Sequence, residues 1–254
     1  MEPSTNIAHD HSKSIDDKIK KIIDDTIKKI NSQYTEYTKA EASPITALDD
    51  KKKEITDKAI QEVESAIQEI NNINPPREKE ETKQLMLKSH QWKLIISIPL
   101  EWQPTLLNNL AALELESLEN MTKGELIEIE RSAPGTLRGI AYAAAKGYPA
   151  LLISLEKSGC LDNLTKEEFI KIERSAPGTL GYIALSAVKG HPALLINLVK
   201  SGYLENLTKD ELIEIERSAP GTLRNISLAA TKGHPALLIK LEKSGYLDNL
   251  TKEE

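Results

Sequence analysis

The heptapeptide RSAPGTL stands at residues 131–137, again at 174–180 and a third time at 217–223. Successive copies begin 43 residues apart, and the heptapeptide contains no nucleophile–base motif. A fixed period of this length is typical of a repeated supersecondary unit. Proline belongs in a turn or in the first turn of a helix, and glycine relieves the backbone beside it. The heptapeptide therefore predicts a helix end, a tight turn and a helix start.

The first helix of each unit is predicted by a capping box. In the unit 207–249, Thr208 is the expected N-cap residue and Glu211 lies three positions later, where it can bond back to the N-cap backbone. Leu207 and Leu212 flank this box as a hydrophobic staple, and we expect the helix to end near residue 218. The same spacing recurs in Thr122 with Glu125, Thr165 with Glu168 and Thr251 with Glu254.

Two more helices are predicted in each unit. The second covers about 222–232 and ends at Gly233, a residue type that favours the position after a helix. The third follows at once, with Pro235 at or near its first position and Gly245 at its end. The candidate core residues of the second helix are Leu223, Ile226, Leu228 and Ala230.

Three short helices cannot bury their apolar faces alone, whereas stacked units can. We therefore predict an all-α protein whose C-terminal part is an α-solenoid of tandem 43-residue repeats. The aromatic content is only 4%, which favours a core of Leu, Ile and Ala between packed helices. The array is predicted over 99–254, with a degenerate cap at 104–120, units at about 121–163, 164–206 and 207–249, and the truncated start of a further unit at 250–254.

The N-terminal part of the chain carries a different pattern. Residues 1–13 are polar without a period, and they are predicted to be disordered. Between 14 and 98, apolar residues spaced by three and four predict helices over about 14–34, 46–72 and 78–97. The narrow stripes predict an antiparallel helical hairpin, and a coiled-coil segment that self-associates through 14–73 is the alternative.

Charge and composition exclude several classes of function. The net charge is −6, and no basic block is present to favour a nucleic-acid or membrane surface. The single cysteine fits a reducing compartment, and the N-terminus lacks a secretory signal pattern. No apolar run is long enough to span a bilayer. We expect a soluble protein of cytoplasmic type; secretion into a host cell would need a route that uses no signal peptide.

The second and third helices resemble the helical part of the ankyrin repeat. LAATKGHPALLIKLEKSGYLDN at 228–249 is similar to that repeat, with Gly233, His234 and Gly245 at the ankyrin spacing. The TPLH signature is absent, and a predicted helix at 207–218 stands where an ankyrin unit has its β-hairpin. Armadillo and HEAT units are the second choice, because they share the unit length. The resemblance implies an interaction scaffold whose concave side includes the second helix.

The three copies of the unit differ at a limited set of positions. Steps of three and four place many of them along one side of the second helix, here called the varied strip. A constant frame with varied side chains is typical of a modular binding surface, although drift at exposed positions predicts the same pattern. The candidate partner-binding residues are Arg138, Gly139, Tyr142, Tyr182, Leu185, Arg224 and Asn225 on the second helix and Ser154, Asn197 and Lys240 on the third.

No motif predicts catalysis, a cofactor site or a metal site. His9 and His11 lack a third ligand, and Cys160 replaces a tyrosine of the other units, which favours an apolar role over a nucleophilic one. His191 and His234 follow a turn glycine and are interpreted as braces of that turn. The charged residues of the first helices are interpreted as a solvated face: Glu128, Glu130, Lys171, Glu173, Glu214 and Glu216.

Three functional hypotheses follow from these patterns. The first is a scaffold that binds a protein partner through the varied strip. The Ile-, Lys- and Asn-rich composition extends this hypothesis to a host-directed effector of an intracellular bacterium. The second is a nucleic-acid-binding array that resembles TAL-effector repeats, against which the near-neutral units argue. The third is a fragment of a larger enzyme or toxin. The first is favoured, and the protein is predicted not to be an enzyme.

Overall fold

The protein is all-α in a computed structural model that describes residues 5–41, 48–73, 80–99, 102–104, 107, 118–162, 164–234 and 239. Every secondary-structure element in these ranges is an α-helix, which confirms the predicted class. The chain divides into two compact units, Met1–Leu106 and Leu107–Glu254. The predicted border between the hairpin segment and the array lay at 98/99.

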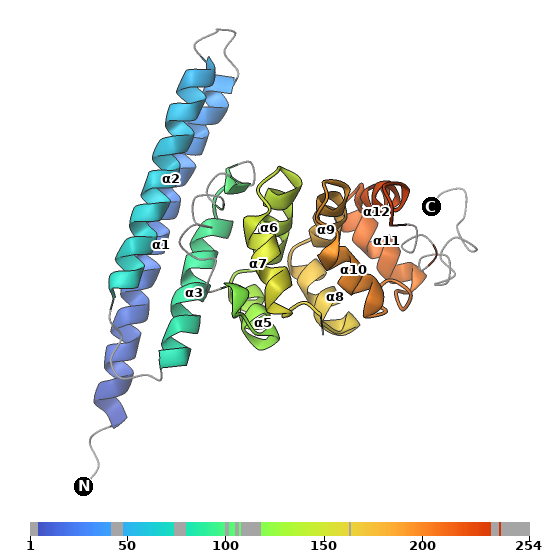
Figure 1. Cartoon of the computed structure of the whole chain (residues 1–254). Coiled ribbons are helices and arrows are strands. Elements are labelled where there is room, and N and C mark those ends of the chain that lie inside the picture. The colour runs from blue at the N-terminus through green and yellow to red at the C-terminus, as the bar shows by residue number, and fades with distance from the viewer. Residues whose placement is uncertain are drawn as a thin grey trace. The chain divides into compact units, whose positions relative to one another are not determined.

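The N-terminal unit is built on two long helices that run alongside each other (Figure 1). Lys29 of the first pairs with Glu62 of the second at 2.7 Å, and Glu36 pairs with Lys51 at 3.6 Å. As the residue number rises along the first helix, the number of the ion-pair partner on the second helix falls, so the two helices are antiparallel. The helices of this unit are α1 (Thr5–Glu41), α2 (Leu48–Asn72) and α3 (Glu80–Ile96).

The apolar stripes of α1 and α2 are buried within the chain. Ile19 and Ile23 of α1 form a cluster with Ile70 of α2. This burial favours the intramolecular hairpin over a coiled-coil segment that self-associates, because the apolar stripe is already covered within the chain. The apolar stripe residues of α2 are all buried: Ile55, Ala59, Ile60, Val63, Ile67 and Ile70.

The first helix is longer than its apolar stripe. Residues 5–13, predicted to be disordered, lie in α1, and the helix continues through residues 35–41, where a break was predicted. Both predictions were wrong at these ends. The stripe gives only the part of a helix that packs, and polar turns that extend from a packed helix carry no periodic signal.

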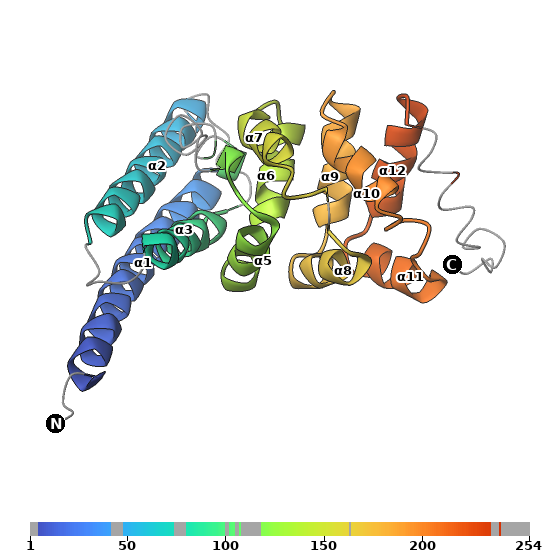
Figure 2. The same ribbon diagram turned by 60° about the horizontal axis from the view of Figure 1, so that its bottom comes forward.

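In the described residues, the helices of the second compact unit are two sets of three, α5 to α7 and α8 to α10, followed by α11 and α12. The second helices of the repeats lie side by side in the order α6, α9, α12, and the first helices α5, α8 and α11 form another row (Figure 2). The repeat helices are α5 (Lys123–Ser132), α6 (Thr136–Ala145), α7 (Ala150–Ser158), α8 (Lys166–Ser175), α9 (Thr179–Val188), α10 (Ala193–Lys200), α11 (Lys209–Ser218) and α12 (Thr222–Thr231).

The three capping boxes within the described residues are confirmed. Thr208 accepts a hydrogen bond from the Glu211 backbone N–H at 3.2 Å, and the Glu211 carboxylate accepts one from the Thr208 N–H at 2.7 Å. The boxes at Thr122 and Thr165 have the same two bonds. The fourth predicted box, Thr251 with Glu254, lies outside the described residues. The repeated threonine therefore has a structural reason in each described copy.

Glycines end the second and third helices as predicted. Gly202 has a φ of +77°, and the next N–H, that of Tyr203, bonds to the Leu198 carbonyl at 3.2 Å. This is the Schellman arrangement, and it recurs after the second helices. Proline stands next to the first helical position, since Pro149 and Pro192 are the N-cap residues of α7 and α10. Pro235 lies outside the described residues.

The core of the third unit differs from its prediction at one residue. Ile226 and Ala230 are buried and Leu223 is half-buried, but Leu228 is 39% exposed. Leu228 stands on the varied strip of α12, on the side that carries Tyr142 and Leu185 in the earlier units.

Among the described residues, no helix is long and apolar enough to cross a membrane.

We predict that Gly178→Ala destabilises the protein by about 1–2 kcal/mol, because Gly178 has a φ of +92° that a side chain tolerates poorly. The added Cβ would also stand 3.4 Å from the Ala219 Cβ of the next unit. Chemical denaturation followed by circular dichroism measures the loss.

Gly124→Ala is the matched control. Gly124 lies in α5, and an added Cβ would meet nothing closer than the Thr122 hydroxyl oxygen at 4.0 Å. Alanine there should stabilise the protein by about 0.5–1 kcal/mol. Equal destabilisation by both substitutions would contradict the role given to the left-handed corner.

Candidate interaction surface

A glutamate just before each RSAPGTL motif holds the corner together. Glu173 is in α8, and its carboxylate accepts hydrogen bonds from the Gly178 N–H at 2.6 Å and the Leu180 N–H at 2.8 Å. These donors lie at the start of α9, whose N-cap residue is Gly178 and has no side chain to cap the helix. The carboxylate of the preceding helix thus supplies the missing acceptor.

The same bond pair occurs in all three units. Glu130 accepts from the Gly135 and Leu137 N–H groups, and Glu216 accepts from the Gly221 and Leu223 N–H groups. A first helix is therefore tied to its second helix at the turn in every described copy. This explains why the turn sequence is repeated without change.

Two of these glutamates were assigned wrongly to a solvated face. Glu130 is 3% exposed and Glu173 is 2% exposed. Burial raises the pKa of Glu130 to about 7, although the bonds from the Leu137 and Gly135 N–H groups and the nearby Arg138 charge oppose the shift. Burial raises the pKa of Glu173 for the same reason. Glu216 in the last described unit is half-buried, and Glu214 is exposed as predicted.

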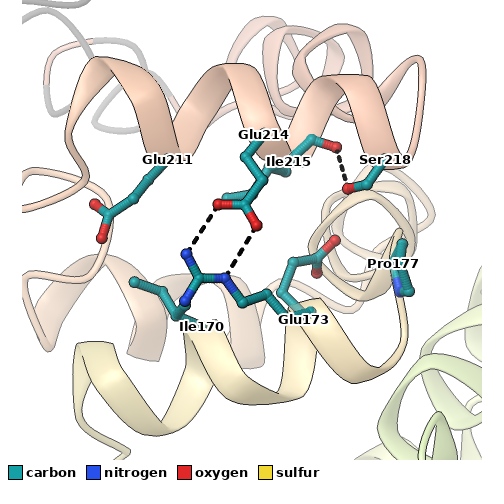
Figure 3. Close-up of a pocket in the computed structure, with 8 residues that line it drawn as sticks. Ile170, Glu173, Pro177, Glu211, Glu214, Ile215 and Ser218 are labelled. Carbon is teal, nitrogen blue, oxygen red and sulfur yellow. Dashed lines mark hydrogen bonds and ion pairs between the residues drawn. The ribbon is translucent and has the colours of Figure 1, made fainter.

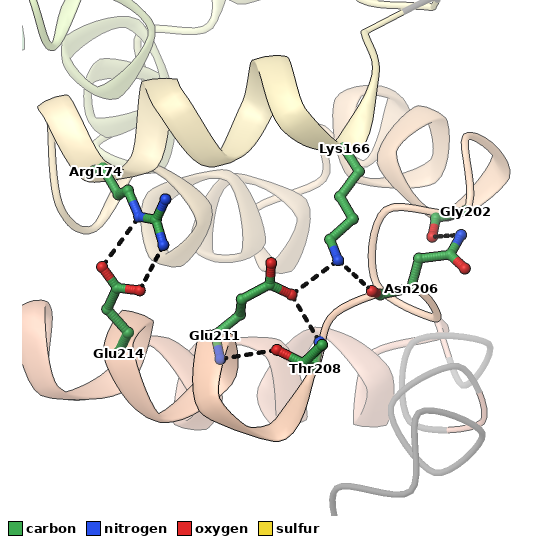
Figure 4. A network of polar contacts seen from close by, with 7 residues as sticks. All are labelled: Lys166, Arg174, Gly202, Asn206, Thr208, Glu211 and Glu214. Atoms are coloured by element: carbon green, nitrogen blue, oxygen red, sulfur yellow. Dashed lines mark hydrogen bonds and ion pairs between the residues drawn. The ribbon is translucent and has the colours of Figure 1, made fainter.

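Successive units are joined by a row of ion pairs on the first helices. Lys166 at the start of α8 contacts the Glu211 carboxylate of α11 at 2.9 Å and donates to the Asn206 carbonyl at 2.5 Å (Figure 4). Lys123 contacts Glu168 at 3.2 Å in the preceding pair of units. The capping-box glutamate therefore serves two purposes, because it caps its own helix and binds a lysine of the unit before.

The varied strip between the first two units is a contact zone. Tyr142 of α6 packs edge-on against Tyr182 of α9, with ring centroids 4.9 Å apart. Arg138 donates to the Pro177 carbonyl at 3.4 Å, and its Nε is buried without a partner. All three side chains are half-buried, so each combines a contact to the neighbouring unit with some exposure to solvent.

The next pair of units uses different side chains at the same positions. Asn225 of α12 donates to the Gly181 carbonyl at 3.2 Å. Gly181 is buried, and a Cβ there would stand 3.0 Å from the Thr222 hydroxyl oxygen, which indicates a close approach of α9 and α12. Leu185 is half-buried and Arg224 is exposed. The variation is thus partly a set of contacts specific to each pair of neighbours.

The other candidate binding residues differ in how far they are exposed to solvent. Gly139 and Ser154 are buried, so they present no side chain to a partner. Asn197 is half-buried and donates to the Asp162 carboxylate of the preceding unit. Lys240 lies outside the described residues. The strip residues with accessible side chains are Arg138, Tyr142, Tyr182, Leu185, Arg224 and Asn225.

A pocket of about 230 Å³ lies between α8 and α11. Its residues come from α8, the turn that follows it, and α11 (Figure 3). Arg174 of α8 donates two hydrogen bonds to Glu214 of α11, at 3.1 and 2.9 Å (Figure 4). Sequence reasoning missed this pocket because it assigned the whole face to solvent. The lining residues are Ile170, Glu173, Arg174, Pro177, Glu211, Glu214, Ile215 and Ser218.

Within the described ranges, no group of three His, Cys, Asp or Glu side chains could hold a metal ion. Cys160 is buried, and burial raises the pKa of its thiol.

No protein-family model matches the chain, and no curated protein or solved structure is significantly similar to it.

We predict that the stabilising effect of Glu130 depends on pH. Its pKa is about 7 in the folded protein and lies near 4.5 without burial, so the folded state binds the proton more tightly. The contribution of Glu130 is then greatest below about pH 4.5 and falls as the pH rises to about 7. The unfolding free energy of the wild type minus that of Glu130→Gln should fall by about 2–3 kcal/mol across this window.

Glu128→Gln is the control for this pH series. Glu128 lies in the same helix as Glu130, but the hydrogen bond from Arg131 lowers the pKa of its carboxyl. The corresponding difference should therefore not fall as the pH rises from about 4.5 to 7. A Glu130 difference that is flat with pH, or one that rises, would contradict the buried-carboxylate account.

Proposed function

We propose that the protein is an interaction scaffold that binds a protein partner through the varied strip of α6, α9 and α12. The observation that carries this proposal is the division between frame and strip. The turn carboxylates, capping boxes and helix-ending glycines repeat from unit to unit, whereas accessible side chains change along one row of helices. A rigid frame that varies only in its accessible side chains suits recognition.

The chemistry of the strip supports a protein as the partner. Its accessible side chains include two tyrosines and two arginines, residue types that are enriched in protein–protein interfaces. Leu185 and the 39% exposed Leu228 add apolar area beside them. The ankyrin-like pattern of the second and third helices also favours this use. The hypothesis of a host-directed effector rests on composition alone and stays a prediction, as does the continuation of the array into a solenoid.

We predict that Leu185→Ala combined with Arg224→Ala weakens partner binding by tenfold or more, which corresponds to about 1.4 kcal/mol. Leu185 is half-buried and Arg224 exposed, so the double variant removes strip surface without cutting a hydrogen bond between the units described above. Partners are captured from cell lysate on the immobilised full chain, and the binding of each captured protein is then measured with both chains.

Ile213→Ala combined with Arg217→Ala is the matched control on α11. It removes one half-buried aliphatic side chain and one exposed arginine from the row of first helices. A partner lost by the strip variant and kept by this control supports the proposal. A partner that binds both variants like the wild type, or that both variants lose equally, excludes the strip as its site. Circular dichroism must first show that both variants are folded.

A further inference from the structure

We propose that the pocket between α8 and α11 binds one arginine side chain of a partner. This inference rests on the proposed function, because it takes the partner to be a protein. It assigns to the row of first helices a second contact site, separate from the varied strip, and it can be tested without knowledge of the partner.

The pocket has the size and the walls for a single long side chain. Its volume is about 230 Å³, which is below the range of pockets that enclose a whole drug-sized ligand. Ile170, Pro177 and Ile215 supply apolar walls between the two helices. Arginine has an aliphatic stem that can lie along such walls while its charged end reaches polar groups.

Carboxylates surround the same space. Glu173, Glu211 and Glu214 line the pocket and come from both helices (Figure 3). Glu173 is 2% exposed, whereas the side chain of Glu214 is 52% exposed at the opening. A ligand with a cationic end therefore meets a buried acceptor on the side of α8 and an accessible one on the side of α11.

Carboxylates outnumber cations among the lining residues. The eight residues that line the pocket include three glutamates and one arginine, Arg174. Lys166 pairs with Glu211 at 2.9 Å, and Arg174 pairs with Glu214 at 2.9 Å. Two backbone N–H groups hold Glu173, and the charge of Arg138 acts on it from outside the lining set. A positive charge from a partner therefore meets a lining that is richer in acceptors than in cations.

The geometry of Glu214 favours a guanidinium over an ammonium group. Glu214 already forms the two parallel hydrogen bonds that a carboxylate makes with arginine, here with Arg174. The side chains of this pair are 58% and 52% exposed, and exposed ion pairs contribute little to stability. A guanidinium from a partner can thus share Glu214 or replace Arg174 there at small cost.

The preceding pair of units contains a natural control. The positions that correspond to the eight lining residues hold the same residue types in α5, α8 and the turn at Pro134, except that Lys171 replaces Glu214. Arg131, which corresponds to Arg174, bonds instead to Glu128 of its own helix at 2.5 and 3.0 Å. Among the lining positions, this substitution alone reverses the charge offered to a cation; outside them, Glu128, which holds Arg131, has Lys171 as its counterpart in α8.

The test uses the full chain and a small probe, N-acetyl-arginine methylamide, in an NMR titration of backbone amides. We expect saturable shifts of residues 170–177 and 211–218, with a dissociation constant on the order of 1 mM. The citrulline analogue of the probe, which has nearly the same shape but no charge, should bind at least ~10-fold more weakly.

Two variants exchange the residue that distinguishes the junctions. Glu214→Lys should weaken probe binding at least ~10-fold and should fold normally, because Lys171 already occupies that position in the unit before. Lys171→Glu should add a second site, seen as shifts of residues 127–134 and 168–175. Absence of saturable shifts in the wild type, or equal binding by wild type and Glu214→Lys, would overturn the inference.

The outcome is separable from that of the proposed function. A partner that is lost by the Leu185 and Arg224 variant but bound normally by Glu214→Lys, together with a probe that does not bind, leaves the strip in place and removes the pocket. If the probe binds the wild type but not Glu214→Lys, and no partner is weakened by the strip variant, the pocket proposal is supported and the strip is excluded as a binding site.

Discussion

The array depends on a carboxylate that reaches across a turn. Each second helix begins at a glycine in the left-handed conformation, which makes a sharp corner but leaves the first N–H groups without a side-chain cap. The glutamate that ends the first helix fills this need with two hydrogen bonds. It therefore fixes the angle between the two helices. A buried charge is costly unless it is bonded, so the glutamate, the glycine and the turn require one another.

Contacts between units use the same parts again. The capping-box glutamates Glu168 and Glu211 each cap their own helix and also bind a lysine of the unit before, so local helix formation and stacking are coupled at these two junctions. On the row of second helices the contacts differ: an aromatic pair joins α6 and α9, whereas an amide-to-carbonyl bond joins α9 and α12. The constant contacts set the geometry of stacking, and the varied contacts adjust each junction.

Most of the fold could be predicted because its signals are local. Capping boxes, helix-ending glycines and apolar stripes each act within a few residues, and Thr208 with Glu211 is found as predicted. The burial of Glu130 and Glu173 was missed because periodicity treats any charged residue as solvated. The signal was present, since a glutamate precedes every RSAPGTL copy. The pocket at Glu214 requires the stacking of two units, and no pattern within one unit contains that information.

Lys171 and Glu214 occupy the same position of successive units and carry opposite charges. Both residues are exposed, and the pairs they accept or prevent are worth little free energy. A charge reversal at this position does not change the buried corner. Glu130 and Glu173, in two successive units, accept the same hydrogen bond from the N–H of the turn glycine. In our proposal, stability and recognition are carried by different side chains of one helix: Glu173 holds the corner, and Lys171, two positions before it, sets the charge offered to a ligand. A substitution at the exposed position would then change what the surface binds without a change in how the units stack.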